Sequence, residues 1–88
     1  MPNVSVALNG GNNVENVQAV TIGNSRWGQN GSPYGVALPV LDGNHQQITV
    51  LTTNNHNQIG YVDVLANHNV ALTLTVDIAN LAIAIAPI

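Results

Sequence analysis

Apolar and polar residues alternate with a period of two over much of the chain, most regularly in its second half. Residues 48–52, 59–65 and 70–76 each alternate large apolar side chains with small or polar ones. Each of these segments follows an Asn-His dipeptide, at Asn44-His45, Asn55-His56 and Asn67-His68. A period of two is the period of a β-strand, and Asn-rich breaks between such segments are typical of turns. The second half of the chain is therefore predicted to form regular turn-strand units.

The first half of the chain carries the same signals less regularly. We expect strands over residues 4–8, 14–22 and 35–41, with a long polar loop over residues 23–34 between the last two. A bulge near Asn16-Val17 would re-aim the second of these strands. Pro39 has no N–H to donate to a ladder, so the strand that contains it is predicted to lie at an edge or to be bulged.

These segments, with a last strand over residues 81–88, amount to about seven short strands and no helix. The predicted fold class is all-β, as a small β-sandwich or a jelly-roll-like domain. A β-solenoid is the alternative, because Asn residues at matching positions of successive units would stack as ladders. We assign residues 1–88 to a single domain, in which the C-terminal apolar strand 81–88 is available for contacts between subunits.

The C-terminal strand has no polar side chain on either face before Pro87. A strand that is apolar on both faces is usually buried on both faces. We therefore predict that the Ala face of this strand packs against another subunit, or that the strand pairs into a neighbour's sheet as an added strand. The candidate interface residues of this strand are Leu81, Ile83, Ile85 and Ile88. The alternative is a central strand with a small-residue outer face. A membrane helix over residues 70–88 is not expected, because the period is two and Asp77 would lie near mid-span.

Charged residues make up only 6% of the chain, whereas ordinary soluble domains contain about 25%. The chain has no Lys and a single Arg, and it contains 14 Asn and 5 Gln. Charged side chains normally protect sheet edges from pairing with other chains and keep surfaces soluble. We therefore predict a structural protein whose partners are copies of itself, in a surface filament, a coat or a particle shell. A single Arg cannot supply a nucleic-acid interface.

The loop after residue 24 contains the chain's only Trp and its only Arg. Trp, Tyr and Arg are the residues that most often anchor protein interfaces, so Trp27, Arg26 and Tyr34 are candidate interface residues. An aromatic face beside amide groups is also suited to sugars. The alternative function is therefore a small multimeric carbohydrate-binding module. Its candidate ligand-binding residues are Arg26, Trp27, Gln29, Asn30 and Tyr34. A third interpretation places Trp27 in the core, with Arg26 paired to Asp42 or Glu15.

Patterns for catalysis and for cofactors are missing from the sequence. No nucleophile motif surrounds a Ser, no phosphate-binding glycine pattern follows a strand, and there is no Cys. The three His residues lie in predicted turns, where a polar role is usual. We therefore expect no enzyme activity, no cofactor and no metal site. The N-terminus shows no signal-peptide pattern, and a cell-surface, extracellular or particle-associated location is favoured by the predicted assembly.

Overall fold

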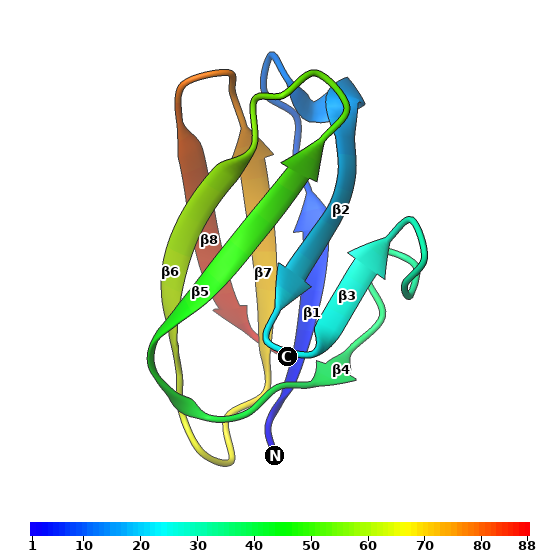
Figure 1. Cartoon of the computed structure of the whole chain (residues 1–88). Helices are drawn as coiled ribbons and strands as arrows, with labels where there is room; N and C mark the ends of the chain where they lie inside the picture. Colours follow the sequence, from blue (N-terminus) through cyan, green and yellow to red (C-terminus); the bar gives the residue numbers. More distant parts are fainter.

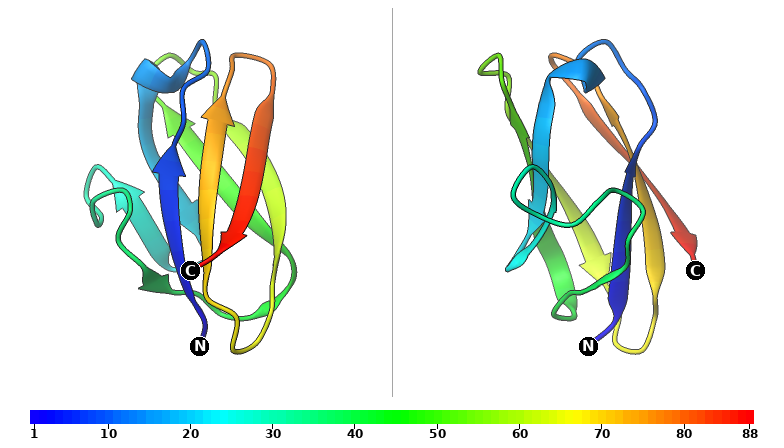
Figure 2. Two further views of the ribbon diagram at one scale, coloured as in Figure 1. Left: turned by 180° about the vertical axis from the view of Figure 1, so that it is seen from behind. Right: turned by 90° about the vertical axis from the view of Figure 1, so that its right-hand side faces the viewer.

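Two β-sheets pack face to face in the computed structural model, which describes residues 1–88 (Figure 1). Its elements, in chain order, are β1 (Asn3–Leu8), η1 (Val14–Asn16), β2 (Val17–Ile22), β3 (Ser25–Gly28), β4 (Leu38–Pro39), β5 (Gly43–Thr52), β6 (Gln58–Val64), β7 (Val70–Val76) and β8 (Leu81–Pro87). The two layers are seen side-on in Figure 2. The predicted all-β sandwich is confirmed, and the β-solenoid alternative is wrong because the strands form two separate open sheets.

The first sheet, called sheet A, has the strand order β4-β1-β7-β8, and the second, sheet B, has the order β3-β2-β5-β6. Strands β1 and β7 are parallel, whereas all other neighbours are antiparallel. The C-terminal strand β8 pairs with β7 along its whole length, from Leu81 opposite Val76 to Pro87 opposite Val70. It has no neighbour on its other side, so the alternative of a central C-terminal strand is wrong.

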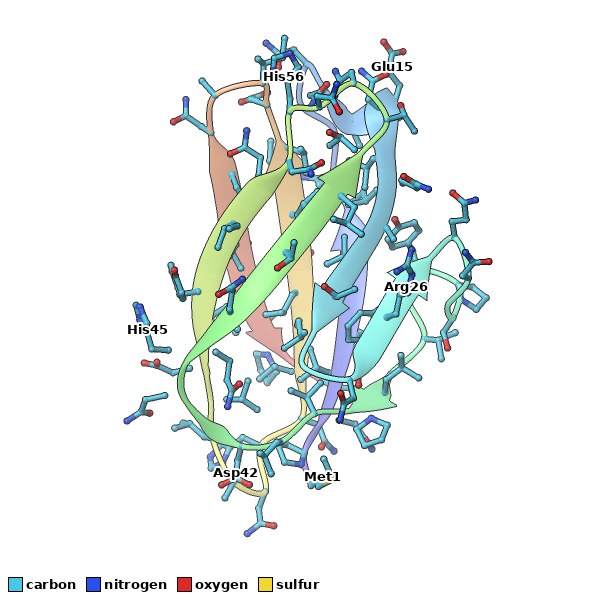
Figure 3. The ribbon with its side chains drawn as sticks, in the orientation of Figure 1. Met1, Glu15, Arg26, Asp42, His45 and His56 are labelled. Atoms are coloured by element: carbon cyan, nitrogen blue, oxygen red, sulfur yellow. The ribbon has the colours of Figure 1, made fainter.

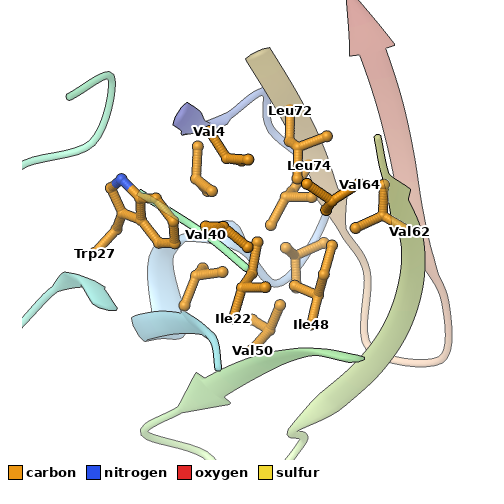
Figure 4. Packing of buried hydrophobic residues seen from close by; sticks show 13 residues of the cluster. Val4, Ile22, Trp27, Val40, Ile48, Val50, Val62, Val64, Leu72 and Leu74 are labelled. Atoms are coloured by element: carbon orange, nitrogen blue, oxygen red, sulfur yellow. The ribbon is translucent and has the colours of Figure 1, made fainter. Parts of the chain in front are cut away.

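Alternate residues of the facing strands fill the space between the sheets (Figure 4). In β7, Leu72, Leu74 and Val76 are buried, and the residues between them are partly exposed. The period of two in the sequence therefore becomes an inner and an outer face. The buried core cluster consists of Val4, Val6, Val20, Ile22, Trp27, Val40, Ile48, Val50, Val62, Val64, Leu72, Leu74 and Val76. Each such side chain contributes about 1.5–3 kcal/mol by leaving water, and this burial holds the sheets together.

The Asn-His dipeptides owe their positions to backbone conformation. Asn55 and Asn67 have φ angles of 63° and 61°, in the left-handed region that Asn tolerates better than most residues. In the first dipeptide the left-handed residue is His45, with φ 58°. That dipeptide lies inside β5, where the pairing with β6 shifts between Gly43 and Gln46, so the predicted turn there is a bulge.

The first half of the chain differs from its prediction in three places. Residues 14–16 form the turn η1 rather than the start of a strand, and the expected irregularity follows between Val17 and Ala19. The predicted polar loop contains the strand β3. The predicted strand over residues 35–41 is reduced to β4, with Val36 exposed and Val40 buried. Pro39 lies on an edge strand of sheet A, as predicted.

Candidate functional site

Trp27 lies in β3 with its side chain fully buried, on the side of the core cluster where Figure 4 also shows Val4 and Val40. Its indole Nε1–H donates a hydrogen bond of 2.8 Å to the carbonyl oxygen of Val36. The apolar ring is thus packed and its single donor is satisfied. The prediction that Trp27 anchors an interface or stacks on a sugar is wrong, because its ring offers no accessible face. The alternative position in the core is the one observed.

Arg26 is partly exposed, and its guanidinium stabilises the loop that follows β3. Its Nε–H donates a hydrogen bond of 2.7 Å to the carbonyl oxygen of Gln29. The predicted pairing of Arg26 with Asp42 or Glu15 is wrong. Figure 3 shows these two acids toward opposite ends of the sandwich, with Arg26 between them and apart from both.

Gln29 and Asn30 are exposed at the tip of the same loop. The Gln29 side-chain oxygen accepts a hydrogen bond of 2.6 Å from the Gln18 amide. Asn30 has a φ angle of 61°, and its side chain makes no hydrogen bond within the chain. Of the two exposed residues at this tip, Asn30 is therefore the one whose side chain makes no hydrogen bond within the chain.

Tyr34 is partly exposed and packs against the core from the outer end of this loop. Its hydroxyl is buried without a hydrogen-bond partner. Burial raises the pKa of Tyr34 above the ordinary value of 10.0, and the positive charge of Arg26 opposes this with a smaller effect. The ring covers Gly28, where a Cβ would lie 2.6 Å from the hydroxyl. The Tyr34 side chain therefore packs the end of this loop against Gly28 of β3.

The predicted interface residues of the C-terminal strand fall into two pairs. Leu81 and Ile83 are partly buried and pack against the core. They lie over Gly60 of β6, where an added Cβ would be 3.0 Å from a Leu81 methyl and 2.8 Å from an Ile83 methyl. They therefore close the seam between the two sheets. Ile85 and Ile88 are 55% and 68% exposed and remain accessible to a partner.

Two hydrogen bonds at the ends of the β7–β8 ladder show which backbone groups of β8 are unpaired. Asp77 N–H donates to the carbonyl of Asn80 (2.9 Å), and Ile88 N–H donates to that of Asn69 (3.1 Å). Hydrogen-bonded pairs alternate in an antiparallel ladder, so the even-numbered residues of β8 face β7. The N–H and C=O groups of Leu81, Ile83 and Ile85 then point away from the sheet. No side chain or loop of the chain hydrogen-bonds to this outer edge.

Of the other three sheet edges, two are covered by backbone hydrogen bonds. The loop after β3 returns along it, with Gly28 N–H donating to Ser32 and Ser32 N–H donating to the carbonyl of Arg26. The outer side of β1 is covered by β4 and by a hydrogen bond of 2.8 Å from Gly35 N–H to Val6. The last edge, β6, has seven residues like β8 and no further strand beside it, but it carries the charge of Asp63. Of these two long, uncovered edges, the outer edge of β8 is therefore the one without a charged side chain.

The exposed outer face of sheet B holds an aromatic pair that the sequence analysis missed. The rings of His45 and Tyr61 stack with their centroids 4.0 Å apart and their planes 8° apart. His45 N–H also donates a hydrogen bond of 2.7 Å to the Asp63 carboxylate. The alternation of apolar and polar residues in β6 could have indicated the exposed position of Tyr61. It places Tyr61 and Asp63 on the face opposite Val62 and Val64.

The three His residues do not form a common site. Figure 3 shows His45 on one flank of the sandwich and His56 at its end. No group of three or more His, Asp and Glu side chains is arranged to hold a metal ion. The structure also contains no long apolar helix of the kind that crosses a membrane.

Comparisons of the chain with protein families, with curated proteins and with solved structures gave no match. The candidate site therefore rests on the geometry of this chain alone. Two surfaces stand out, the uncovered edge of β8 and the stacked His45–Tyr61 pair.

Proposed function

We propose that this chain is a structural, self-assembling β-protein that forms a homopolymer or a symmetric oligomer, such as a surface filament, a coat or a particle shell. The observation that carries the proposal is the outer edge of β8, where the backbone groups of Leu81, Ile83 and Ile85 are unpaired. Natural proteins normally blunt such an edge with Lys, Pro, a bulge or a covering loop. Here the first three are absent from residues 81–86, and no loop covers them.

The low charge of the whole chain supports the same proposal. Residues 78–88 have no charged side chain, so the side chains of two β8 strands that approach each other do not repel through like charges. The exposed large apolar residues include Ile85 and Ile88 beside this edge. Covering them on assembly contributes free energy in proportion to the apolar area that leaves water.

The test compares the same substitution at two isoleucines of equal exposure. Ile85 in β8 is 55% exposed, and Ile59 on the outer face of β6 is 56% exposed. We expect the wild type and Ile59→Lys to be oligomeric in size-exclusion chromatography with light scattering at about 50 µM. Ile85→Lys is expected to be monomeric with an unchanged β-sheet circular dichroism spectrum. A wild-type chain that remains monomeric under these conditions would contradict the proposal.

The second candidate function is a small multimeric carbohydrate-binding module, and the stacked His45–Tyr61 pair favours it. The pair presents aromatic surface on an exposed sheet, and Gln47 lies directly opposite Tyr61 in the β5–β6 ladder. An aromatic face beside an amide is suited to a sugar ring. The candidate sugar site is therefore this pair and not the loop after β3. In that loop Trp27 is buried and Arg26 is hydrogen-bonded to the backbone of the loop itself.

A glycan array separates the two candidates. The carbohydrate-binding function requires a positive array that Tyr61→Ala makes blank, while light scattering shows the same oligomer. Asn30→Ala serves as the matched control, since it removes the free amide of the originally predicted loop. The structural function requires a blank array and an oligomer that depends on Ile85.

A further inference from the structure

The unpaired edge of β8 is complementary to itself. Leu81, Ile83 and Ile85 each present one outward donor and one outward acceptor, in an evenly spaced row. An antiparallel ladder joins residues that exchange both hydrogen bonds. A second copy of β8 rotated by 180° offers the same row in the opposite direction. The partner that this edge fits best is therefore another copy of the chain.

We propose that β8 pairs antiparallel with β8 of a second copy about a two-fold axis at Ile83, which joins two sheets A into one continuous sheet. This inference rests on the proposed self-assembly and names its contact and its symmetry. In this register Ile83 lies opposite Ile83 of the partner subunit, and Leu81 lies opposite Ile85 of the partner subunit. All three outward residues of each strand then donate and accept.

Pro87 selects this register over its neighbours. Position 87 also belongs to the outward set, but proline has no N–H to donate. A two-fold axis at Ala84 would place Leu81 opposite Pro87 of the partner subunit and leave acceptors without donors. An axis at Ala82 would place Ile85 opposite a residue beyond the end of the partner's strand. The axis at Ile83 avoids both losses.

The side chains of β8 fit the same arrangement. Ile85 is 55% exposed in the single chain and would be covered by Leu81 of the partner subunit. Aliphatic side chains that lie opposite one another on a sheet stabilise the pairing. On the other face, Ala82 lies opposite Ala84 of the partner subunit. Both alanines are exposed and small, so they raise no steric barrier to the approach of the strands.

The covered opposite edge limits what this contact can build. On the far side of sheet A, β4 and the hydrogen bond from Gly35 N–H to the Val6 carbonyl cover the outer edge of β1. The edge of β8 therefore cannot pair with β1 of another copy. A contact between identical edges about a two-fold axis is closed after two copies. The β8 contact therefore produces a dimer, and any larger particle would be built from dimers through other surfaces.

The absence of Cys from the chain makes cross-linking a direct test of the register. Ala82→Cys and Ala84→Cys are mixed under mild oxidation, with one variant labelled with nitrogen-15 so that mass spectrometry separates mixed from self-linked pairs. Residues in a non-hydrogen-bonded antiparallel pair have Cα atoms about 4.5 Å apart, within the range of a disulfide. We expect mainly mixed pairs. The control is Ala37→Cys, an exposed alanine in the loop before β4, which is expected to stay unlinked.

Each other outcome has a distinct meaning. Self-linked Ala84→Cys would place the axis at Ala84 and overturn the proposed register. An oligomer by light scattering without cross-links would overturn pairing through β8 and leave self-assembly standing through another surface. A wild-type monomer would overturn both proposals.

A backbone substitution tests the hydrogen bonds themselves. Ile85→Pro removes an outward N–H and leaves the β7 ladder intact, as the native Pro87 does two residues later in the same strand. The dimer then loses one hydrogen bond from each copy. We expect its dissociation constant to rise about tenfold or more, with an unchanged circular dichroism spectrum. An unchanged dissociation constant would show that the edge of β8 does not hold the dimer.

Discussion

At the scale of single residues, two adjacent glycines after β1 allow the cost of backbone strain and the cost of a steric clash to be measured separately. Gly10 and Gly11 have similar φ angles, +96° and +99°, so alanine is strained at both. A Cβ at Gly10 would meet nothing within 4 Å, whereas one at Gly11 would lie 2.7 Å from the carbonyl carbon of Val76 and closer still to its oxygen.

We expect Gly10→Ala to lower the free energy of unfolding by about 1–2 kcal/mol and Gly11→Ala by about 1–3 kcal/mol more. The additional loss arises because the backbone of β7 cannot give way as a flexible side chain would. Urea unfolding of both variants at one protein concentration measures the difference. Equal losses at the two positions would show that the approach of this turn to Val76 is not tight.

Tyr34 gives the chain a specific sensitivity to alkaline pH. Burial raises the pKa of its hydroxyl in the folded state above 10.0, the value for the unfolded chain. Above pH 10 the unfolded state therefore loses its proton first and binds fewer protons than the folded state. The free energy of unfolding is unaffected below pH 10 and falls as the pH rises through the folded-state pKa.

Tyr34→Phe removes both this titration and a buried hydroxyl without a partner. We expect the variant to be as stable as the wild type or slightly more stable at pH 7, and to lose less stability between pH 9 and 11. Thermal unfolding across this range measures both effects. Parallel curves for the two proteins would assign the alkaline loss to other groups.

Individual buried residues were predictable where a regular strand sets them. Leu72, Leu74 and Val76 follow from the period of two alone, because the outer face of their strand carries Ala and Thr. Trp27 was not predictable in this way. Its burial depends on the chain returning so that the carbonyl of Val36 meets the indole, and nothing in a four-residue strand signals that return.

At the scale of elements, the C-terminal strand has two roles on its two sides. Its inner side chains, Leu81 and Ile83, close the seam over Gly60, and its outer backbone edge is unpaired. The sequence indicated an apolar strand with an unusual second face. It did not indicate the edge position, because the neighbour of β8 in the sheet is decided by long-range packing. The same dependence explains why β3 was missed and why the strand predicted over residues 35–41 is reduced to β4.

Removing residues 81–88 should therefore unfold the domain as well as prevent assembly. The truncation exposes the core beneath Leu81 and Ile83 and leaves β7 without its antiparallel neighbour. We expect the free energy of unfolding to fall by about 3 kcal/mol or more. The measurement is urea unfolding, in which the midpoint moves to a lower urea concentration or the cooperative transition disappears. A truncated chain with wild-type stability would show that β8 contributes little to the core.

At the scale of the whole molecule, the scarcity of charge distinguishes this sandwich from ordinary soluble domains. Only Glu15, Arg26, Asp42, Asp63 and Asp77 carry charged side chains. None of them lies on β8, and Asp77 and Asp63 accept hydrogen bonds from backbone N–H groups within the chain. The rest of the surface consists of amides, hydroxyls and apolar groups. Attraction between copies must then come from backbone hydrogen bonds and apolar contact rather than from ion pairs.

This balance of forces predicts how the assembly responds to salt. Interactions between exposed charges are screened over about 10 Å at 0.1 M salt and over about 3 Å at 1 M. The edge of β8 has no charge to screen, so the dissociation constant should change by less than about threefold between 0.02 M and 0.5 M NaCl. Sulfate at equal ionic strength should instead tighten the dimer, because it strengthens apolar burial. Sedimentation equilibrium of the wild-type chain in the two salts measures both effects. A wild-type dimer that dissociates as NaCl is raised would place the contact on a charged surface and away from β8.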